Sequence, residues 1–176
     1  METERLKLRP PSMKLQPLML EAIKESESEL SEYLPWVPYA LTEEESIENT
    51  KLAMSNFDNF EGELRYSLLE KHSGRFVGAI GLIIRDKGVP FFEIGYWLRS
   101  SCAGFGFMTE AVQAVEEYAF RDLKANRVEI KAAEGNSKSR RVAERCGYKL
   151  EGTLHNDRRL PSGQLSNTVV YAKTGL

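Results

Sequence analysis

The sequence predicts a mixed α/β (α+β) fold built on a single, mostly antiparallel, twisted sheet with about four helices. Its 176 residues and 20.0 kDa suit one domain over residues 1–176 that buries its own core. A hydrophobic content of 41% with 28% charged residues is typical of globular proteins. Short strand-like segments follow one another in the middle of the chain and then alternate with helix-like ones.

The first third of the chain predicts one strand and two helices. Leu6 and Leu8 alternate with charged residues, which is typical of a half-buried strand, and residues 16–32 are rich in helix formers. Prolines on both sides of Trp36 should end that helix. Thr42 and Glu45 have the spacing of a capping box and predict a second helix that reaches about residue 56.

The remainder predicts an antiparallel meander followed by helices and further strands. Three β-rich segments are joined by short, turn-rich connectors, which favours hairpin pairing between neighbours. We expect strands at residues 65–70, 75–84, 91–98, 127–132, from 148 onward and at 167–172, and helices at 109–120 and 137–146.

Charge is divided unevenly along the chain. Residues 1–63 hold 6 basic and 14 acidic residues, whereas residues 64–176 hold 18 basic and 12 acidic ones. This division suits a cationic ligand on one part of the surface and an anionic ligand on the other. With an isoelectric point near 5.8, the protein is not expected to have the broad basic surface of a nucleic-acid-binding protein, so no nucleic-acid partner is expected.

The composition also bears on location and metal binding. No apolar run approaches the roughly 20 residues that span a bilayer, and residues 1–5 lack the pattern of a secretory signal. Cys102 and Cys146 are far apart and predict free thiols in a reducing compartment. The scattered His and Cys residues have no ligand spacing. We therefore expect a cytoplasmic protein without a membrane partner or a metal.

A glycine-containing loop is the first candidate site. Gly104 and Gly106 lie between a predicted strand and a helix that begins near Thr109. Backbone N–H groups at such a helix N-terminus suit a phosphate or pyrophosphate. A dinucleotide-binding fingerprint requires a third glycine where Thr109 stands, and the G-K-[S/T] of a P-loop is absent. The residues alone leave a plain tight turn open.

A second motif follows about thirty residues later: Asn136-Ser-Lys-Ser139 at a predicted helix start, with Gly147-Tyr148 after it. With Thr3–Pro10, Ile94-Gly-Tyr96 and Gly104–Ala111 in this order, the chain resembles the GCN5-related N-acetyltransferases (GNAT) over essentially its whole length. The resemblance is closest to the branch that acetylates protein N-termini, including ribosomal-protein α-amino acetyltransferases. It implies the GNAT acyl-CoA acyltransferase fold and acetyl-CoA as cosubstrate.

In that family the loop reads Gln/Arg-Gly-x-Gly-x-Gly/Ala and holds the pyrophosphate of coenzyme A. Here Ala103 replaces the Gln or Arg, and Phe105 stands where a polar or basic residue is frequent. Arg140 is a further candidate near the phosphates. The resemblance and the loop position imply cofactor contacts from Trp97, Leu98, Arg99, Ala103, Gly104, Phe105, Gly106, Phe107, Met108, Thr109, Asn136 and Arg145.

The resemblance also implies catalytic roles. The family separates two strands around Trp97 and Leu98, so that the pantetheine arm pairs with backbone like an added strand. Asn136 would hydrogen-bond this arm, and Ser139 would stabilise or protonate the leaving sulfur. Asn136 is equally a strong N-cap residue, and the two roles are compatible.

The residue that accepts the proton of the amine stays open. Some relatives use a glutamate after the Gly-Tyr strand, where this chain has Arg158 beside Asp157; Glu93 is the other candidate and would act through water. At pH 7 an α-amine of pKa about 8 costs only ~1 kcal/mol to deprotonate, against ~4.6 kcal/mol for a lysine of pKa about 10.4. A weak base therefore favours an α-amine.

We expect Trp36, Tyr39 and His155 on the acceptor side. The sequence thus predicts an acetyl-CoA-dependent N-acetyltransferase acting on a protein N-terminal α-amine of the ribosomal-protein type. One alternative is a small amine, such as a polyamine or an aminoglycoside. Another is a non-catalytic acyl-CoA-binding sensor, which Ala103 and Arg158 favour. A homodimer is common in the family.

Overall fold

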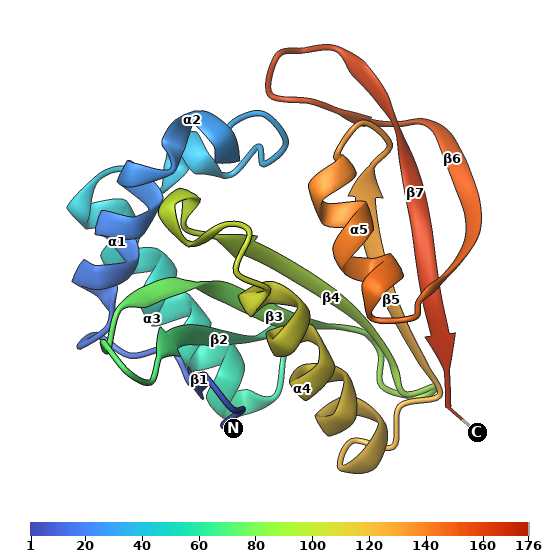
Figure 1. Cartoon of the computed structure of the whole chain (residues 1–176), viewed down its shortest axis with the longest axis horizontal. Helices are drawn as coiled ribbons and strands as arrows, with labels where there is room; N and C mark the ends of the chain where they lie inside the picture. Colours follow the sequence, from blue (N-terminus) through green and yellow to red (C-terminus); the bar gives the residue numbers. More distant parts are fainter. Residues whose placement is uncertain (176) are drawn as a thin grey trace.

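The computed structural model describes residues 1–175 and contains a seven-stranded sheet of order β1-β2-β3-β4-β5-β7-β6 (Figure 1). Only the β4–β5 pair is parallel among these strands, so the predicted mixed, mostly antiparallel sheet is confirmed. The strands are β1 (Leu6–Arg9), β2 (Glu63–Glu70), β3 (Phe76–Asp86), β4 (Phe91–Leu98), β5 (Arg127–Ala133), β6 (Lys149–Arg159) and β7 (Leu165–Thr174). The helices are α1 (Gln16–Glu25), α2 (Glu27–Leu30), α3 (Glu43–Asn59), α4 (Phe107–Arg121) and α5 (Ser137–Arg145), with 3₁₀ turns η1 (Val37–Tyr39) and η2 (Ser100–Cys102).

Helices cover both faces of the sheet. Because side chains alternate along a strand, Ile94 of β4 packs with Val112 of α4, whereas Trp97 packs on the opposite face with Ile23 of α1. Helix α5 lies on the α4 face, and α3 packs beside α1. The main core lies under α4 and α5, and a smaller cluster lies under α1 and α2.

The prediction of one continuous helix over residues 16–32 is wrong, because the structure has two helices, α1 and α2, that meet at Ser26. Ser26 is fully buried, and its Oγ donates a hydrogen bond to Ala22 O and accepts one from Ser100 N. A serine that hydrogen-bonds an earlier carbonyl competes with the helical backbone. The break raises the number of α-helices in residues 1–175 from the expected four to five.

The other differences concern boundaries. Helix α4 begins at Phe107, two residues before the predicted start, because Gly106 already occupies the N-cap with a φ of 81°. Strand β6 continues to Arg159, well beyond the Gly-Tyr segment, with register shifts against β7. The capping box of Thr42 and Glu45 is confirmed at the start of α3. Within residues 1–175, no helix is long and apolar enough to cross a membrane.

Candidate active site

Strands β4 and β5 separate after a short parallel contact. Their register runs only from Phe91↔Arg127 to Glu93↔Glu129, after which β4 continues beside β3 to Leu98 and β5 continues beside β7 to Ala133 (Figure 1). Beyond Glu93 the facing backbone groups of both strands therefore have no strand partner within residues 1–175. Such unpaired edges can bind an extended ligand in the manner of an added strand.

The glycine loop lies at the far end of β4 and leads into α4. Gly104 and Gly106 have φ values of 88° and 81°, which side-chain-bearing residues adopt only with strain. No side chain caps α4, and the N–H groups from Gly104 to Thr109 donate to no acceptor within residues 1–175. Phe107 and Met108 bury their side chains, so they present only backbone donors here. Free N–H groups at a helix N-terminus suit an anion such as pyrophosphate.

The structure separates the three arginines predicted near the phosphates. Arg145 Nε donates to Thr109 Oγ1 at 3.2 Å, so this cation lies beside the loop. Arg99 is directed toward α1: its buried guanidinium forms ion pairs with Glu21 and Glu25 through Nε and Nη2.

Arg140 is also directed elsewhere. Its Nε donates to Tyr171 Oη at 3.1 Å and its Nη1 to Glu134 O at 3.0 Å, so it fastens α5 to β7 and to the end of β5. Of the three arginines, only Arg145 contacts the loop region in the structure.

Asn136 and Ser139 lie together at the start of α5. Asn136 Oδ1 accepts a hydrogen bond from Ser139 N at 3.0 Å, which confirms the N-cap. Its Nδ2 donates to no acceptor within the described chain and is free for a ligand. Ser139 Oγ lies 3.2 Å from Tyr96 Oη, and Tyr96 Oη donates to Ser139 O at 3.0 Å. Burial raises the pKa of Tyr96, so its hydroxyl stays protonated.

Tyr96 is a residue that the sequence argument did not assign to the site. It belongs to β4, whereas Ser139 belongs to α5, so the pair joins the two sides of the strand separation. The Ile-Gly-Tyr96 motif was visible in the sequence, but it gave no indication of the residue that the phenol contacts.

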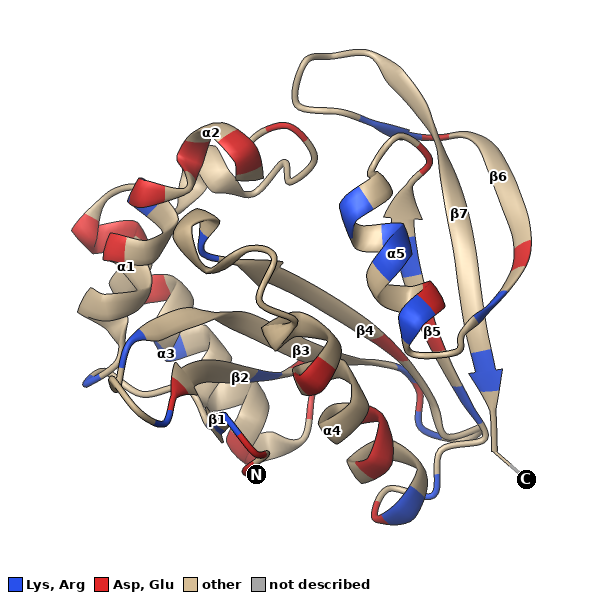
Figure 2. Cartoon of the chain, in the orientation of Figure 1, with Lys and Arg blue, Asp and Glu red and all other residues tan. Residues whose placement is uncertain are grey.

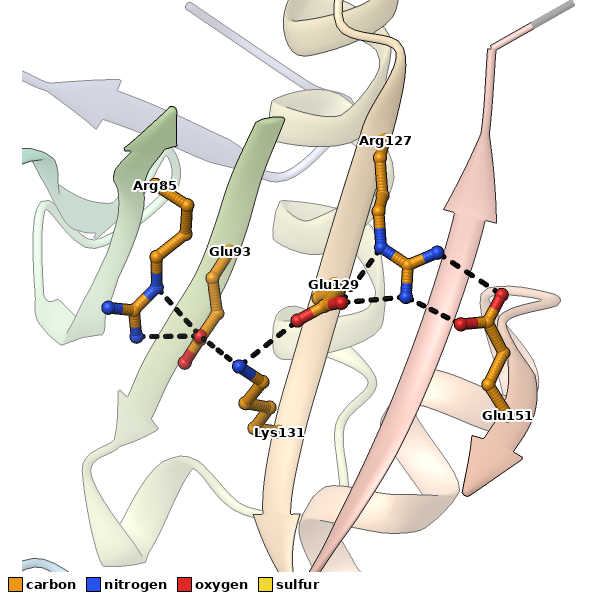
Figure 3. A network of polar contacts seen from close by, with 6 residues as sticks. All are labelled: Arg85, Glu93, Arg127, Glu129, Lys131 and Glu151. Carbon is orange, nitrogen blue, oxygen red and sulfur yellow. Dashed lines mark hydrogen bonds and ion pairs between the residues drawn. The ribbon is translucent and has the colours of Figure 1, made fainter. Parts of the chain in front are cut away.

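Glu93 lies where β4 and β5 separate, and it is bound by two cations (Figure 3). Its Oε2 accepts from Arg85 Nη2 at 2.7 Å and lies 3.4 Å from Lys131 Nζ. Lys131 also contacts Glu129, which is bound by Arg127, and the network ends at Glu151 (Figure 3). By strand alternation Glu93 faces the Trp97 side of the sheet, opposite to Tyr96 and Ser139.

Arg158, which the family resemblance aligned with a glutamate, lies on β6. Its Nε donates to Thr168 Oγ1 at 2.8 Å, and the side chain is partly buried on β6. Burial lowers the pKa of Arg158, while the nearby carboxylates of Asp157 and Glu93 oppose this shift. An arginine here attracts an anion and cannot replace the missing carboxylate as a base.

Of the three residues predicted on the acceptor side, Trp36 and Tyr39 lie in the same turn and His155 lies on β6. Trp36 packs against Trp97 with 6.2 Å between ring centroids, close to the open end of β4. Tyr39 is 71% exposed on η1. His155 is exposed on the irregular part of β6.

A cavity of about 410 Å³ lies instead between α2, the β5–α5 turn and the β6–β7 hairpin. Tyr33 donates from Oη to Gly135 O at 3.2 Å and links the first third of the chain to the β5–α5 turn. The cavity is lined by Ser31, Glu32, Tyr33, Gly135, Leu160, Ser162, Gln164, Leu165 and Ser166. Sequence reasoning missed this cavity, because residues about 130 positions apart form its walls.

Comparison with known proteins decides the family. The family described as "Acetyltransferase (GNAT) domain" matches residues 5–149. The chain belongs to the GNAT family. It is 29% identical to the uncharacterized N-acetyltransferase p20 of Bacillus licheniformis over 171 residues, which cover 97% of this chain and 93% of p20. It is 37% identical over 78 residues to the ribosomal-protein-serine acetyltransferase of Escherichia coli, covering 43% of this chain and 44% of that protein.

A solved GNAT structure agrees with this assignment. The microcin C7 self-immunity acetyltransferase MccE, solved with acetyl-CoA and AMP, superposes with a TM-score of 0.89 at 25% identity. The match covers 97% of this chain and 93% of MccE. This chain is therefore an acetyl-CoA-dependent N-acetyltransferase with acetyl-CoA as its cosubstrate. The free N–H groups of the glycine loop and the unpaired edge of β4 fit the pyrophosphate and the pantetheine arm of that molecule.

Proposed function

We propose that this GNAT enzyme acetylates the N-terminal α-amine of a protein, with ribosomal proteins as the leading class of acceptor. The observation that supports the proposal most directly is the ion pairing of Glu93. Its Oε2 is already bound by Arg85 and Lys131, so within residues 1–175 only Oε1 is left to receive a proton through water. An α-amine, whose deprotonation at pH 7 costs only about 1 kcal/mol, needs little help from a base.

Two sets of side chains act from opposite faces of the separated strands. Acetyl-CoA supplies the acetyl thioester. Asn136 Nδ2 binds and orients the pantetheine arm, and the Ser139 hydroxyl donates to the sulfur that leaves as the thiolate. Tyr96 holds Ser139 in place through its two contacts with that residue. On the other face Glu93 accepts the amine proton through water.

The cavity beside α2 is the proposed acceptor site. Glu32 lies in its wall, and the surrounding acidic residues of α1 and α2 attract a protonated amine (Figure 2). Figure 2 shows the opposite charge on α5, where Arg145 lies beside the glycine loop and suits the anionic cosubstrate. The Escherichia coli relative is named for acetylation of ribosomal-protein serine, which supports a protein acceptor here.

The acceptor proposal is tested by initial rates with three substrates at equal concentration. These are a peptide with a free N-terminus, the same peptide N-terminally blocked but carrying an internal lysine, and spermidine. We expect acetylation of the free peptide alone, located at its α-amine by tandem mass spectrometry. Acetylation of the blocked peptide at lysine, or of spermidine in preference, contradicts the proposal. Binding of labelled acetyl-CoA without transfer to any amine supports the sensor alternative.

Glu32→Gln tests the acceptor cavity separately. We expect the KM for the peptide to rise about threefold to tenfold, and the KM for acetyl-CoA to stay unchanged, because rim charges guide a cationic ligand more than they bind it. Glu29→Gln removes an exposed carboxylate from α2, three residues before Glu32 and outside the cavity lining, and is the matched control. Equal effects of both substitutions contradict this assignment. The cytoplasmic location, the single domain and the homodimer stay predictions.

A further inference from the structure

Arg5, which directly precedes β1, contacts the glycine loop at the start of α4. Arg5 Nη1 donates to Phe105 O at 2.8 Å, and its guanidinium carbon lies 4.8 Å from the centroid of the Phe107 ring. Arg5 Nη2 lies 3.5 Å from the position that a Cβ on Gly106 would occupy. A cation over an aromatic face is held by electrostatic attraction, so Phe105 and Phe107 both contact this guanidinium, and Gly106 lies between them.

Glu110, in the first turn of α4, fixes the direction of Arg5. Its Oε2 accepts from Arg5 Nε at 2.7 Å, and its Oε1 accepts from Arg5 N at 2.8 Å and from Thr3 Oγ1. Burial opposes ionisation of Glu110, but these hydrogen bonds outweigh it and lower its pKa. The carboxylate is therefore charged at neutral pH, and Arg5 neutralises a negative charge that would repel a phosphate at this helix end.

The contact with Phe105 O also sets the direction of the loop donors. Phe105 O and Gly106 N–H belong to one peptide unit, and no cis peptide bond occurs in the described chain. In a trans peptide the carbonyl and the N–H point in opposite directions. By binding the carbonyl, Arg5 keeps the Gly106 N–H pointing away from the segment before β1, and no acceptor within residues 1–175 engages it.

We propose that Arg5 is a positioning residue for the coenzyme A pyrophosphate. Arg5 orients the glycine loop through its hydrogen bond to Phe105 O, and its positive charge offsets the negative charge of Glu110. This compensates for Ala103, which cannot supply the side-chain contact that Gln or Arg gives at that position. The inference rests on the proposed binding of the pyrophosphate at this loop. It does not depend on the identity of the acceptor.

The test compares two cosubstrates that share the thioester and differ in the pyrophosphate: acetyl-CoA and S-acetylpantetheine. For Arg5→Ala we expect the KM for acetyl-CoA to rise about tenfold, the lower end of what a hydrogen bond to a charged group contributes. We expect kcat to change less than twofold and the KM for S-acetylpantetheine to stay unchanged. Arg9→Ala is the matched control, because Arg9 lies on β1 with the same 44% side-chain exposure and pairs with Glu2.

If Arg5→Ala raises the KM for acetyl-CoA and for S-acetylpantetheine together, the substitution has disturbed the structure generally, and the proposal is wrong. An unchanged KM for acetyl-CoA also contradicts it. Arg5→Lys provides a milder change, since one ammonium cannot reach both Glu110 and Phe105 O in the same fork geometry. An intermediate KM for acetyl-CoA supports the proposal, and a wild-type value contradicts it. Gly104→Ala tests the loop itself. If it leaves the KM for acetyl-CoA unchanged, the pyrophosphate site is wrong; if it raises this KM while Arg5→Ala does not, only the role of Arg5 fails.

Discussion

Removing the Ser139 hydroxyl is the sharpest test of the proposed acid. In the structure the Asn136 cap uses the backbone N–H of Ser139, so Ser139→Ala leaves the start of α5 intact. The substitution removes only the Oγ contact with Tyr96, at 3.2 Å, and the donor proposed for the leaving sulfur. Tyr96→Phe removes the partner hydroxyl and preserves the ring.

The expected magnitudes follow from these contacts. A hydrogen bond to a charged group contributes about 1.5–3 kcal/mol, so Ser139→Ala should lower kcat about 10- to 150-fold. Tyr96 acts through Ser139 by neutral hydrogen bonds of about 1 kcal/mol, so Tyr96→Phe should lower kcat about threefold to tenfold. Because both substitutions remove parts of one unit, the double variant should be about as slow as Ser139→Ala alone.

The assay is steady-state release of coenzyme A thiol with a saturating free-N-terminus peptide, together with acetyl-CoA affinity by titration calorimetry. Ser137→Ala is the matched control, because Ser137 is the exposed first residue of the same helix and forms no side-chain hydrogen bond within the described chain. We expect wild-type affinity for acetyl-CoA in all variants.

Two results would refute this reasoning. A kcat of Ser139→Ala within twofold of the wild type removes its acid role. A double variant whose loss equals the product of the two single losses shows that Tyr96 acts independently of Ser139.

Three further outcomes are expected. Glu93→Gln should lower kcat about tenfold without changing acetyl-CoA affinity, because base catalysis through water is weaker than direct transfer; an unchanged kcat would exclude Glu93. Arg127→Met should lower the free energy of unfolding by about 2 kcal/mol in urea titrations, because Glu129, 7% exposed, loses a partner; equal midpoints would contradict this. The hydrogen bond from Arg99 lowers the pKa of Glu25 from 4.5 to about 2, so its stabilisation is complete above pH 4.5 and is lost as pH falls toward 2. Glu25→Gln should therefore reduce the loss of unfolding free energy between pH 4.5 and pH 2 by no more than about 1 kcal/mol, because the side chain is partly exposed. If the free energy of unfolding changes with pH equally in the variant and the wild type, Glu25 does not contribute to this pH dependence.

Local patterns predicted most of the elements. The alternation of Leu6 and Leu8, the capping box at Thr42 and the meander from β2 to β4 are present in the structure, because short-range periodicity and caps fix them. The break at Ser26 was not predictable in the same way. It depends on Ser100, which is 74 residues away in the sequence and supplies the second hydrogen bond of that buried hydroxyl.

Features that depend on a residue's own backbone conformation could be predicted from the sequence. The positive φ angles of Gly104 and Gly106 and the cap at Asn136 are local properties that sequence spacing can indicate. The contact partners of long charged side chains could not be predicted in this way. Arg99 was predicted near the phosphates, yet the carboxylates of α1 bind it, and no local pattern shows which of several acidic residues a flexible arginine will reach.

The sequence by itself determined the order of the elements, the glycine loop, the Asn-x-x-Ser helix start and the resemblance to the GNAT family. These depend on neighbouring residues and their spacing. The tertiary structure alone decided that Tyr96 meets Ser139, that Arg5 supports the loop, and that Glu93 is held in ion pairs on the opposite face. Except for the pair of Arg85 and Glu93, these contacts join residues tens of positions apart, and they exist only after the sheet has fixed which strands are neighbours and which face each residue occupies.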